Sequence, residues 1–283
     1  MILYPELLHW VKERRKIYQR KEGGEIPPWT DDKILQQFKF TNVERELDRT
    51  TIWVAKNWRK PNKDCTVLWF NMVIACLLNW PDTLDEIGYT KKFIPEEFKA
   101  KLKARRDRGE KVFAAAYIVS TNGRAMDKID YVVDIILTPM WEAREAFEVD
   151  KGKDTKLFLR DLFGLLTSFN GMGSFLASQV VAYMKYEQPW SSAIDWEYFA
   201  TSGPGSRRGM NRLHDRPVKK SQKEEVWLAE LHELQFKLSE DGIDIHAQDV
   251  QNCLCEFDKY MRTKSGEGRP KVRYDGNPNS NTR

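Results

Sequence analysis

The sequence has few cysteines and few histidines. Its 283 residues include four histidines and four cysteines, Cys65, Cys76, Cys253 and Cys255. No Cys-x-x-Cys pair is present, no cysteine has companion histidines at zinc spacing, and four cysteines are too few for a disulfide framework. The sequence therefore predicts reduced thiols and no bound metal.

Long hydrophobic runs are also absent. No stretch approaches the roughly 20 apolar residues that cross a bilayer. The partly apolar N-terminus is interrupted by Glu6, His9 and Lys12, and no cleavage site of a signal peptide follows it. The sequence excludes membrane insertion and predicts a cytoplasmic protein.

The residues that are present favour a globular, mainly helical protein. Hydrophobic residues make up 41% of the chain, enough for one large core or for two lobes. The net charge of +4 permits contact with phosphates without requiring it. Apolar residues recur at helical spacing along most of the chain, and residues 66–78 are long and apolar enough for a buried helix.

We therefore predict an all-α fold. One helical domain is expected over residues 1–262, either as a single body or as two lobes, with a hairpin and a pocket loop at residues 157–213. Residues 263–283 have few apolar positions and are predicted to form a flexible basic tail.

Residues 165–195 have the pattern of a helix-hairpin-helix followed by an acid. Gly171 and Gly173 lie between two helical windows and allow a tight turn. In such a hairpin, the N–H groups around Gly171, Gly173 and Ser174 can hold a phosphate of the DNA backbone. An ordinary turn between helices is the alternative interpretation.

Asp195 follows the second helical window. The hairpin, the loop and this aspartate resemble the helix-hairpin-helix DNA glycosylase superfamily, in which the aspartate points into the pocket for a flipped base. The resemblance implies a DNA glycosylase-like fold, double-stranded DNA as partner and a catalytic Asp195, with helix capping as the alternative. Phe175 stands where bifunctional members have a nucleophilic lysine, so lyase chemistry is not expected.

Two groups of arginines are candidates for binding phosphate or pyrophosphate. The motif Gly-Pro-Gly-Ser-Arg-Arg-Gly at residues 203–209 predicts a loop in which Ser206, Arg207 and Arg208 contact the anion, or else a solvated basic turn. Asn42 can cap a helix over residues 43–60, on which Arg45 and Arg49 would share one face. These two arginines form either a second clamp or ion pairs with neighbouring acids.

Three further segments, at residues 28–32, 40–49 and 254–260, narrow the resemblance. Together with the hairpin and the Gly-Ser-Arg-Arg motif, they resemble the alpha-glutamyl/putrescinyl-thymine pyrophosphorylases, or amino acid:DNA transferases, of phage thymidine hypermodification. The related helical domain of 5-hydroxymethyl-deoxyuridine DNA kinases shares these motifs. The similarity spans about residues 14–262.

The resemblance implies a transferase that displaces pyrophosphate from 5-pyrophosphoryloxymethyl-uracil in DNA. The amine of an amino acid or polyamine is the co-substrate, no cofactor is expected, and the place of action is the cytoplasm of a phage-infected bacterium. Asp195, with Asp48 behind it, would accept the proton of the amine. Asn42 would read or orient the flipped base, on which Trp29 and Trp196 would stack unless they pack in the core.

Two other functions fit the same residues. One is a monofunctional DNA glycosylase acting on a modified pyrimidine through Asp195, and the other is a non-catalytic DNA-binding module that assists a DNA base kinase. The chain has no P-loop, so it is not expected to be the kinase itself. Glu256, Asp258 and Lys259 are interpreted as a structural polar network, with binding of the amine donor as the alternative.

Overall fold

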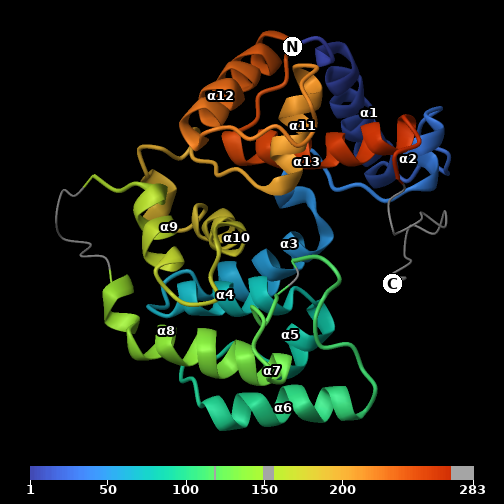
Figure 1. Ribbon diagram of the computed structural model, residues 1–283. Coiled ribbons are helices and arrows are strands. Elements are labelled where there is room, and N and C mark those ends of the chain that lie inside the picture. The colour runs from blue at the N-terminus through green and yellow to red at the C-terminus, as the bar shows by residue number, and fades with distance from the viewer. Residues whose placement is uncertain (118, 149–155, 269–283) are drawn as a thin grey trace. The chain divides into compact units, whose positions relative to one another are not determined.

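The chain folds into two compact units of helices. The computed structural model describes residues 1–117, 119–148 and 156–268 (Figure 1), and these contain no strand, which confirms the all-α prediction. Unit 1 comprises Met1–Asp48 and Ala200–Arg283, and unit 2 comprises Arg49–Phe199. Unit 2 is thus inserted between two parts of unit 1. The hairpin and the glycine-rich motif, grouped at 157–213 by sequence, lie in different units.

Unit 1 is organised around its last helix, α13. Helices α11 and α12 pack against α13 from the C-terminal part of the unit, and α1 and α2 pack against it from the N-terminal part. Trp10, Trp227 and Phe257 are fully buried in the shared core. The helices of unit 1 are α1 (Tyr4–Glu22), α2 (Lys33–Gln37), α11 (Pro204–Leu213), α12 (Glu224–Glu240) and α13 (Ala247–Lys264), with a 3-10 turn at Arg45–Leu47.

Unit 2 has its own core around α4 and α10. The apolar run at residues 66–78 forms α4, which is buried along its whole length and ends at Asn79 in the left-handed conformation. The prediction of a buried helix there is confirmed. The helices of unit 2 are α3 (Arg49–Val54), α4 (Leu68–Leu78), α5 (Pro81–Ile87), α6 (Pro95–Asp107), α7 (Lys128–Asp130), α8 (Thr138–Glu142), α9 (Leu159–Thr167) and α10 (Ser174–Met184). The described residues of this unit also form five 3-10 or π-helical segments, at Ala55–Arg59, Lys60–Asn62, Tyr131–Leu137, Arg144–Phe147 and Trp190–Ser192.

Residues 43–60 do not form the continuous helix that their periodicity predicts. A single 3-10 turn ends at Leu47, Asp48 is extended, and α3 begins only at Arg49. In place of the first helical turns, two side chains hydrogen-bond to the backbone. Asn42 Nδ2 donates to the Leu47 carbonyl, and Asp48 Oδ1 accepts from the Asn42 N–H. The predictions that Asn42 caps a helix and that Arg45 shares a helix face with Arg49 are therefore wrong.

Two features bear on the expected environment of the chain. In the part of the chain that the structure describes, no helix is long and apolar enough to cross a membrane, and no group of three or more histidine, cysteine, aspartate or glutamate side chains is arranged to hold a metal ion. Helix α13 continues to Lys264, two residues into the range predicted as a tail. Residues 269–283 lie outside the described residues.

Candidate functional site

The segment that precedes unit 2 lies along one face of α13. Three residues of that face, Asp249, Asn252 and Glu256, follow helical spacing. Glu256 Oε2 accepts a hydrogen bond from the Thr41 N–H (3.0 Å), and Asn252 Nδ2 donates to Thr41 Oγ1 (3.0 Å). Asp249 Oδ1 accepts from the Arg45 N–H (3.1 Å). Two motifs that are 200 residues apart in sequence therefore meet in unit 1 through hydrogen bonds to the backbone.

Both the oxygen and the nitrogen of the Asn42 side-chain amide form hydrogen bonds within unit 1. Arg14 Nη2 donates to Asn42 Oδ1 (2.9 Å), and Asn42 Nδ2 donates to the Leu47 carbonyl (2.7 Å). Arg14 is buried on α1, and its Nε also donates to the Thr41 carbonyl (3.1 Å). Sequence reasoning missed Arg14, although its place among the apolar positions of α1 was a signal. A base-reading role for Asn42 stays a prediction, and it would require one of these partners to be released.

Asp48 is a carboxylate with an altered acidity. Burial raises the pKa of Asp48 to about 6, and the negative charge of Glu256 adds to the rise. The Asn42 N–H, at 2.9 Å from Oδ1, and the guanidinium groups of Arg45 and Arg14 act in the opposite direction. A carboxylate with this pKa is a stronger base than an exposed aspartate and is still mostly ionised at neutral pH.

Glu256 and Lys259 form an ion pair next to this carboxylate. Lys259 Nζ lies 2.5 Å from Glu256 Oε2, the oxygen that also accepts from Thr41, and 4.6 Å from the ring centroid of Phe40. The pair ties α13 to the segment before unit 2. Asp258, predicted to belong to the same polar network, pairs with Arg208 and Arg212 instead. Binding of an amine donor at Lys259 or Glu256 stays a prediction.

The glycine-rich motif is the start of a helix and not a loop. Helix α11 begins at Pro204, with Gly203 as its N-cap. Ser206 is fully buried, and its hydroxyl accepts a hydrogen bond from the Gly203 N–H (2.9 Å). The prediction of a flexible loop is wrong, because the glycines serve helix packing. Contact of Ser206 with a phosphate is untested, and its hydroxyl already completes the helix cap.

The glycines of this motif let α11 approach α13 closely. A Cβ atom on Gly209 would lie 2.1 Å from the carbonyl oxygen of Leu254, and one on Gly205 would lie 3.0 Å from Cys255 Sγ. Gly205 and Gly209 are four residues apart and therefore share one face of α11. Any larger residue at Gly209 would collide with the backbone of α13.

Arg207 is fully engaged within unit 1. Its Nε donates to Ser202 Oγ (2.7 Å), its Nη1 donates to the Gln222 carbonyl (2.5 Å), and its Nη2 pairs with Glu224 Oε2 (2.5 Å). Each nitrogen of this guanidinium has a protein partner. Of the two neighbouring arginines predicted to bind phosphate, Arg208 is the one whose terminal nitrogens donate to no residue that the structure describes.

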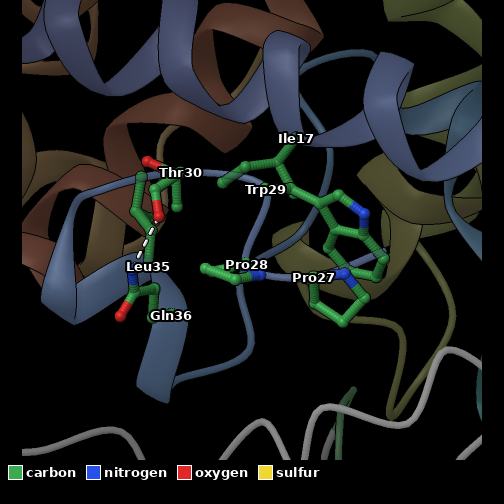
Figure 2. Close-up of a pocket in the computed structure, with 7 residues that line it drawn as sticks. All are labelled: Ile17, Pro27, Pro28, Trp29, Thr30, Leu35 and Gln36. Carbon is green, nitrogen blue, oxygen red and sulfur yellow. Dashed lines mark hydrogen bonds between the residues drawn. The ribbon is translucent and has the colours of Figure 1, made fainter. Parts of the chain in front are cut away.

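Trp29 lines a pocket of about 230 Å³ in unit 1 (Figure 2). The wall is mainly apolar, with Pro27 beside the indole ring and with Pro28 and Leu35 also lining the pocket. Trp29 is 6% exposed, and its Nε1 donates to the Glu25 carbonyl (2.7 Å). The indole therefore has a fixed orientation at the pocket, and its stacking on a base stays a prediction.

The hairpin of unit 2 has the predicted order of helix, turn and helix. Gly171 has a φ of +86°, and a Cβ there would lie 2.6 Å from Ile136 Cγ1, so the turn requires glycine. Gly173 is the N-cap of α10, and Gly173 and Ser174 are exposed. Contact of this turn with the DNA backbone stays a prediction.

Asp195 caps the first hairpin helix. Its Oδ1 accepts from the Leu159 N–H (2.6 Å), and its Oδ2 accepts from the Arg160 N–H (3.1 Å), at the start of α9. Both oxygens thus satisfy backbone donors that the helix itself leaves unpaired. Catalysis by Asp195 is untested, and the geometry matches the capping alternative.

Removing this cap is expected to destabilise unit 2. Asp195→Ala should lower the free energy of unfolding by about 1–2 kcal/mol, because two N–H groups of α9 lose their acceptor. Urea unfolding followed by circular dichroism measures the change. Ser191→Ala, at a nearby exposed serine, is the control. Equal stability of the Asp195 variant and the wild type would contradict the capping role.

Trp196 is bound to a buried lysine of unit 2. Its Nε1 donates to the Lys185 carbonyl (2.7 Å), and Lys185 Nζ donates to the Trp196 carbonyl (2.9 Å). The same Nζ lies 3.7 Å from the centroid of the indole ring, so the ammonium covers one of its faces. Sequence reasoning missed Lys185, which is fully buried. Stacking of Trp196 on a base stays a prediction.

Comparisons with known proteins identify the family of this chain. Residues 2–269 match the family described as "5-hmdU DNA kinase, helical domain". The 5-hmdU DNA kinase of Bacillus phage SP10 is 27% identical over 280 residues, which cover 88% of this chain and 43% of the kinase. The chain thus spans less than half the length of this curated relative. No solved structure matches the chain. Since the family match covers nearly the whole chain, the protein belongs to the family of 5-hmdU DNA kinase helical domains.

Proposed function

We propose that this protein is a transferase of phage thymidine hypermodification that acts in the cytoplasm of the infected host. It replaces the pyrophosphate of 5-pyrophosphoryloxymethyl-uracil in DNA with the amine of an amino acid or a polyamine. Membership in a family named after a DNA kinase, and the phage origin of the relative, support a modified DNA base as the substrate. The observation that carries the proposal is Asp48, a carboxylate with a pKa of about 6 that interacts with Arg45 and Arg14 in unit 1.

The reaction needs a proton acceptor and a positive charge. The amine nitrogen forms a bond to the methylene carbon, the bond from that carbon to the pyrophosphate oxygen breaks, and pyrophosphate leaves with the electron pair. The attacking nitrogen loses one proton, which Asp48 accepts in its ionised form. Arg45 supplies positive charge that stabilises the departing pyrophosphate.

Asp48 takes precedence over Asp195 in this mechanism. The oxygens of Asp195 hold the first turn of α9, whereas Asp48 accepts one backbone hydrogen bond, through Oδ1. A base must be able to take up a proton without losing the contacts that position it. Asp48 meets this condition through its second oxygen.

A nucleoside assay tests the proposal. DNA containing 5-pyrophosphoryloxymethyl-uracil is incubated with the protein and candidate amines, digested, and analysed by mass spectrometry. The expected result is an amine-linked nucleoside and an equal amount of released pyrophosphate. DNA containing 5-hydroxymethyl-uracil is the control, because it lacks the leaving group and should stay unchanged. Retention of the pyrophosphoryl nucleoside with every amine would overturn the proposal.

A second function, a DNA-binding module that assists a base kinase, is favoured by the family description as the helical domain of a kinase. In that case, adding the protein would accelerate phosphorylation of 5-hydroxymethyl-uracil DNA by a separate kinase, and no amine-linked nucleoside would form. Abasic sites in the treated DNA would instead indicate the glycosylase alternative.

A further inference from the structure

Three arginines surround one buried carboxylate between α11 and α13. Asp258 is 1% exposed. Arg212 Nε donates to Asp258 Oδ1 (2.9 Å), Arg208 Nε donates to Oδ2 (2.8 Å), and Arg262 Nε lies 3.5 Å from Oδ2. One carboxylate cannot balance three guanidinium groups, so the cluster attracts a further anion.

Glu267 already serves as such an anion for one of the arginines. Its Oε1 accepts from Arg212 Nη1 (3.2 Å), and its Oε2 accepts from Arg212 Nη2 (2.5 Å). The hydrogen bonds from Arg212 lower the pKa of Glu267 to about 2, so the carboxylate is ionised throughout the physiological range. A two-pronged contact of this kind is also how arginine holds a phosphate.

Arg208 donates to Asp258 through Nε, as Arg212 does, whereas Arg262 Nε forms an ion pair with the same carboxylate without a hydrogen bond. The terminal nitrogens of these two arginines donate to no residue that the structure describes. Their side chains are 38% and 37% exposed, so a ligand in solution can reach them. Because both Nε atoms lie near the same oxygen of Asp258, the two guanidinium groups converge.

Cys255 on α13 interacts electrostatically with an arginine of this cluster and with an arginine that acts on Asp48. Desolvation raises the pKa of the Cys255 thiol to about 12, whereas Arg45 and Arg208 both act to lower it. Arg45 also acts on Asp48. One thiol on α13 therefore experiences the charge of an arginine from each site.

We propose that Arg208 and Arg262, oriented by Asp258, form a phosphate-binding site, and that Glu267 is an internal anion that occupies the neighbouring Arg212. The site takes a phosphoryl group with two accessible oxygens, which either pyrophosphate or the DNA backbone supplies. This inference does not depend on amine transfer. If the protein is the proposed transferase, Arg208 and Arg262 are the residues that retain either the leaving pyrophosphate or the substrate DNA strand.

Binding measurements on the protein of residues 1–283 test the site. The probes are inorganic pyrophosphate, followed by calorimetry, and a short unmodified duplex, followed by fluorescence anisotropy. The double variant Arg208→Gln, Arg262→Gln should weaken binding of at least one probe about tenfold or more, since charge-assisted contacts are lost. Glu267→Gln should strengthen binding of that probe several-fold, because it removes a competing anion. Lys33→Gln, which removes an exposed charge elsewhere in unit 1, should change neither affinity.

The pattern of losses identifies the source of the phosphate. Loss confined to pyrophosphate supports a site for the leaving group, and loss confined to the duplex supports a site for the DNA backbone. Unchanged affinities in the folded double variant, no gain in Glu267→Gln, or failure of the wild type to bind either probe would overturn the inference. A protein that binds through these arginines but transfers no amine would contradict only the proposed function.

Discussion

Replacing Asp48 with asparagine is expected to slow amine transfer by about 10²–10⁴-fold, which is the usual contribution of a general base. Asparagine keeps the size of the side chain and an oxygen for the Asn42 N–H, but it cannot accept the proton of the amine. The wild-type rate should fall as pH drops below about 6, since Asp48 becomes protonated there. Single-turnover formation of the amine-linked nucleoside across a pH series measures both effects.

The same variant is expected to be more stable than the wild type at neutral pH. The pKa of Asp48 in the folded protein is about 6, above its ordinary value of 3.8, so the folded state binds this proton more tightly than the unfolded chain. The free energy of unfolding therefore decreases as pH rises from about 4 to about 6, and the ionised carboxylate costs at most about 3 kcal/mol at neutral pH. Asparagine removes this cost, which thermal unfolding at neutral pH and at about pH 4 would reveal.

Asp195→Asn is the matched control for these experiments. It removes a carboxylate charge from unit 2, where Asp195 caps α9, and it should leave the break in the rate near pH 6 in place. A folded Asp48→Asn variant with the wild-type rate would show that Asp48 is not the base. A variant less stable than the wild type at neutral pH would contradict the raised pKa.

Replacing Gly209 with alanine is expected to destabilise unit 1 by about 3 kcal/mol or more, the upper range for overpacking a tight interface. The new Cβ would lie 2.1 Å from the Leu254 carbonyl oxygen and 2.8 Å from its carbonyl carbon. These are backbone atoms in the middle of α13, so relief requires the two helices to move apart. The shift would also separate Arg208 from Asp258. The variant should therefore lose both stability and affinity for phosphate.

The control for Gly209 is another helical glycine without close neighbours. A Cβ on Gly164 in α9 would meet no atom within 4 Å. Gly164→Ala should therefore stabilise its helix by about 0.5–1 kcal/mol through helix propensity alone. Denaturant unfolding of both variants measures the contrast. A Gly209→Ala variant as stable as the wild type would show that α11 and α13 can separate at little cost.

Local sequence patterns predicted the positions of helices better than they predicted which distant residues contact one another. The apolar run of α4 and the hairpin helices could be located because helical periodicity and glycine turns are short-range signals. The insertion of unit 2 into unit 1 could not, because it depends on which distant segments pack together. The same holds for Asp195, whose backbone partners at Leu159 and Arg160 lie about 35 residues earlier in the chain.

The candidate site shows the same limit. Arg208 and Asp48 could be proposed from their motifs. Arg262 lies in an ordinary helical pattern, and Arg14 is marked only by its place among the apolar positions of its helix. The glycines of α11 were interpreted as loop residues because glycine disfavours helices. The four-residue spacing of Gly205 and Gly209 is a signal for close helix packing. The glycine content of the motif nevertheless favours a loop when the sequence is considered alone.

The inserted topology has a consequence for synthesis of the chain. Unit 2 is one continuous stretch, so all residues of its core are translated before Ala200–Arg283, the second part of unit 1. Helix α1, by contrast, buries Leu7, Trp10 and Val11 in a core that includes Phe257 of α13. This apolar face leaves the ribosome long before its partner and stays uncovered until α13 has been translated. Until then, this face of α1 is exposed to aggregation, which a chaperone bound to it would prevent.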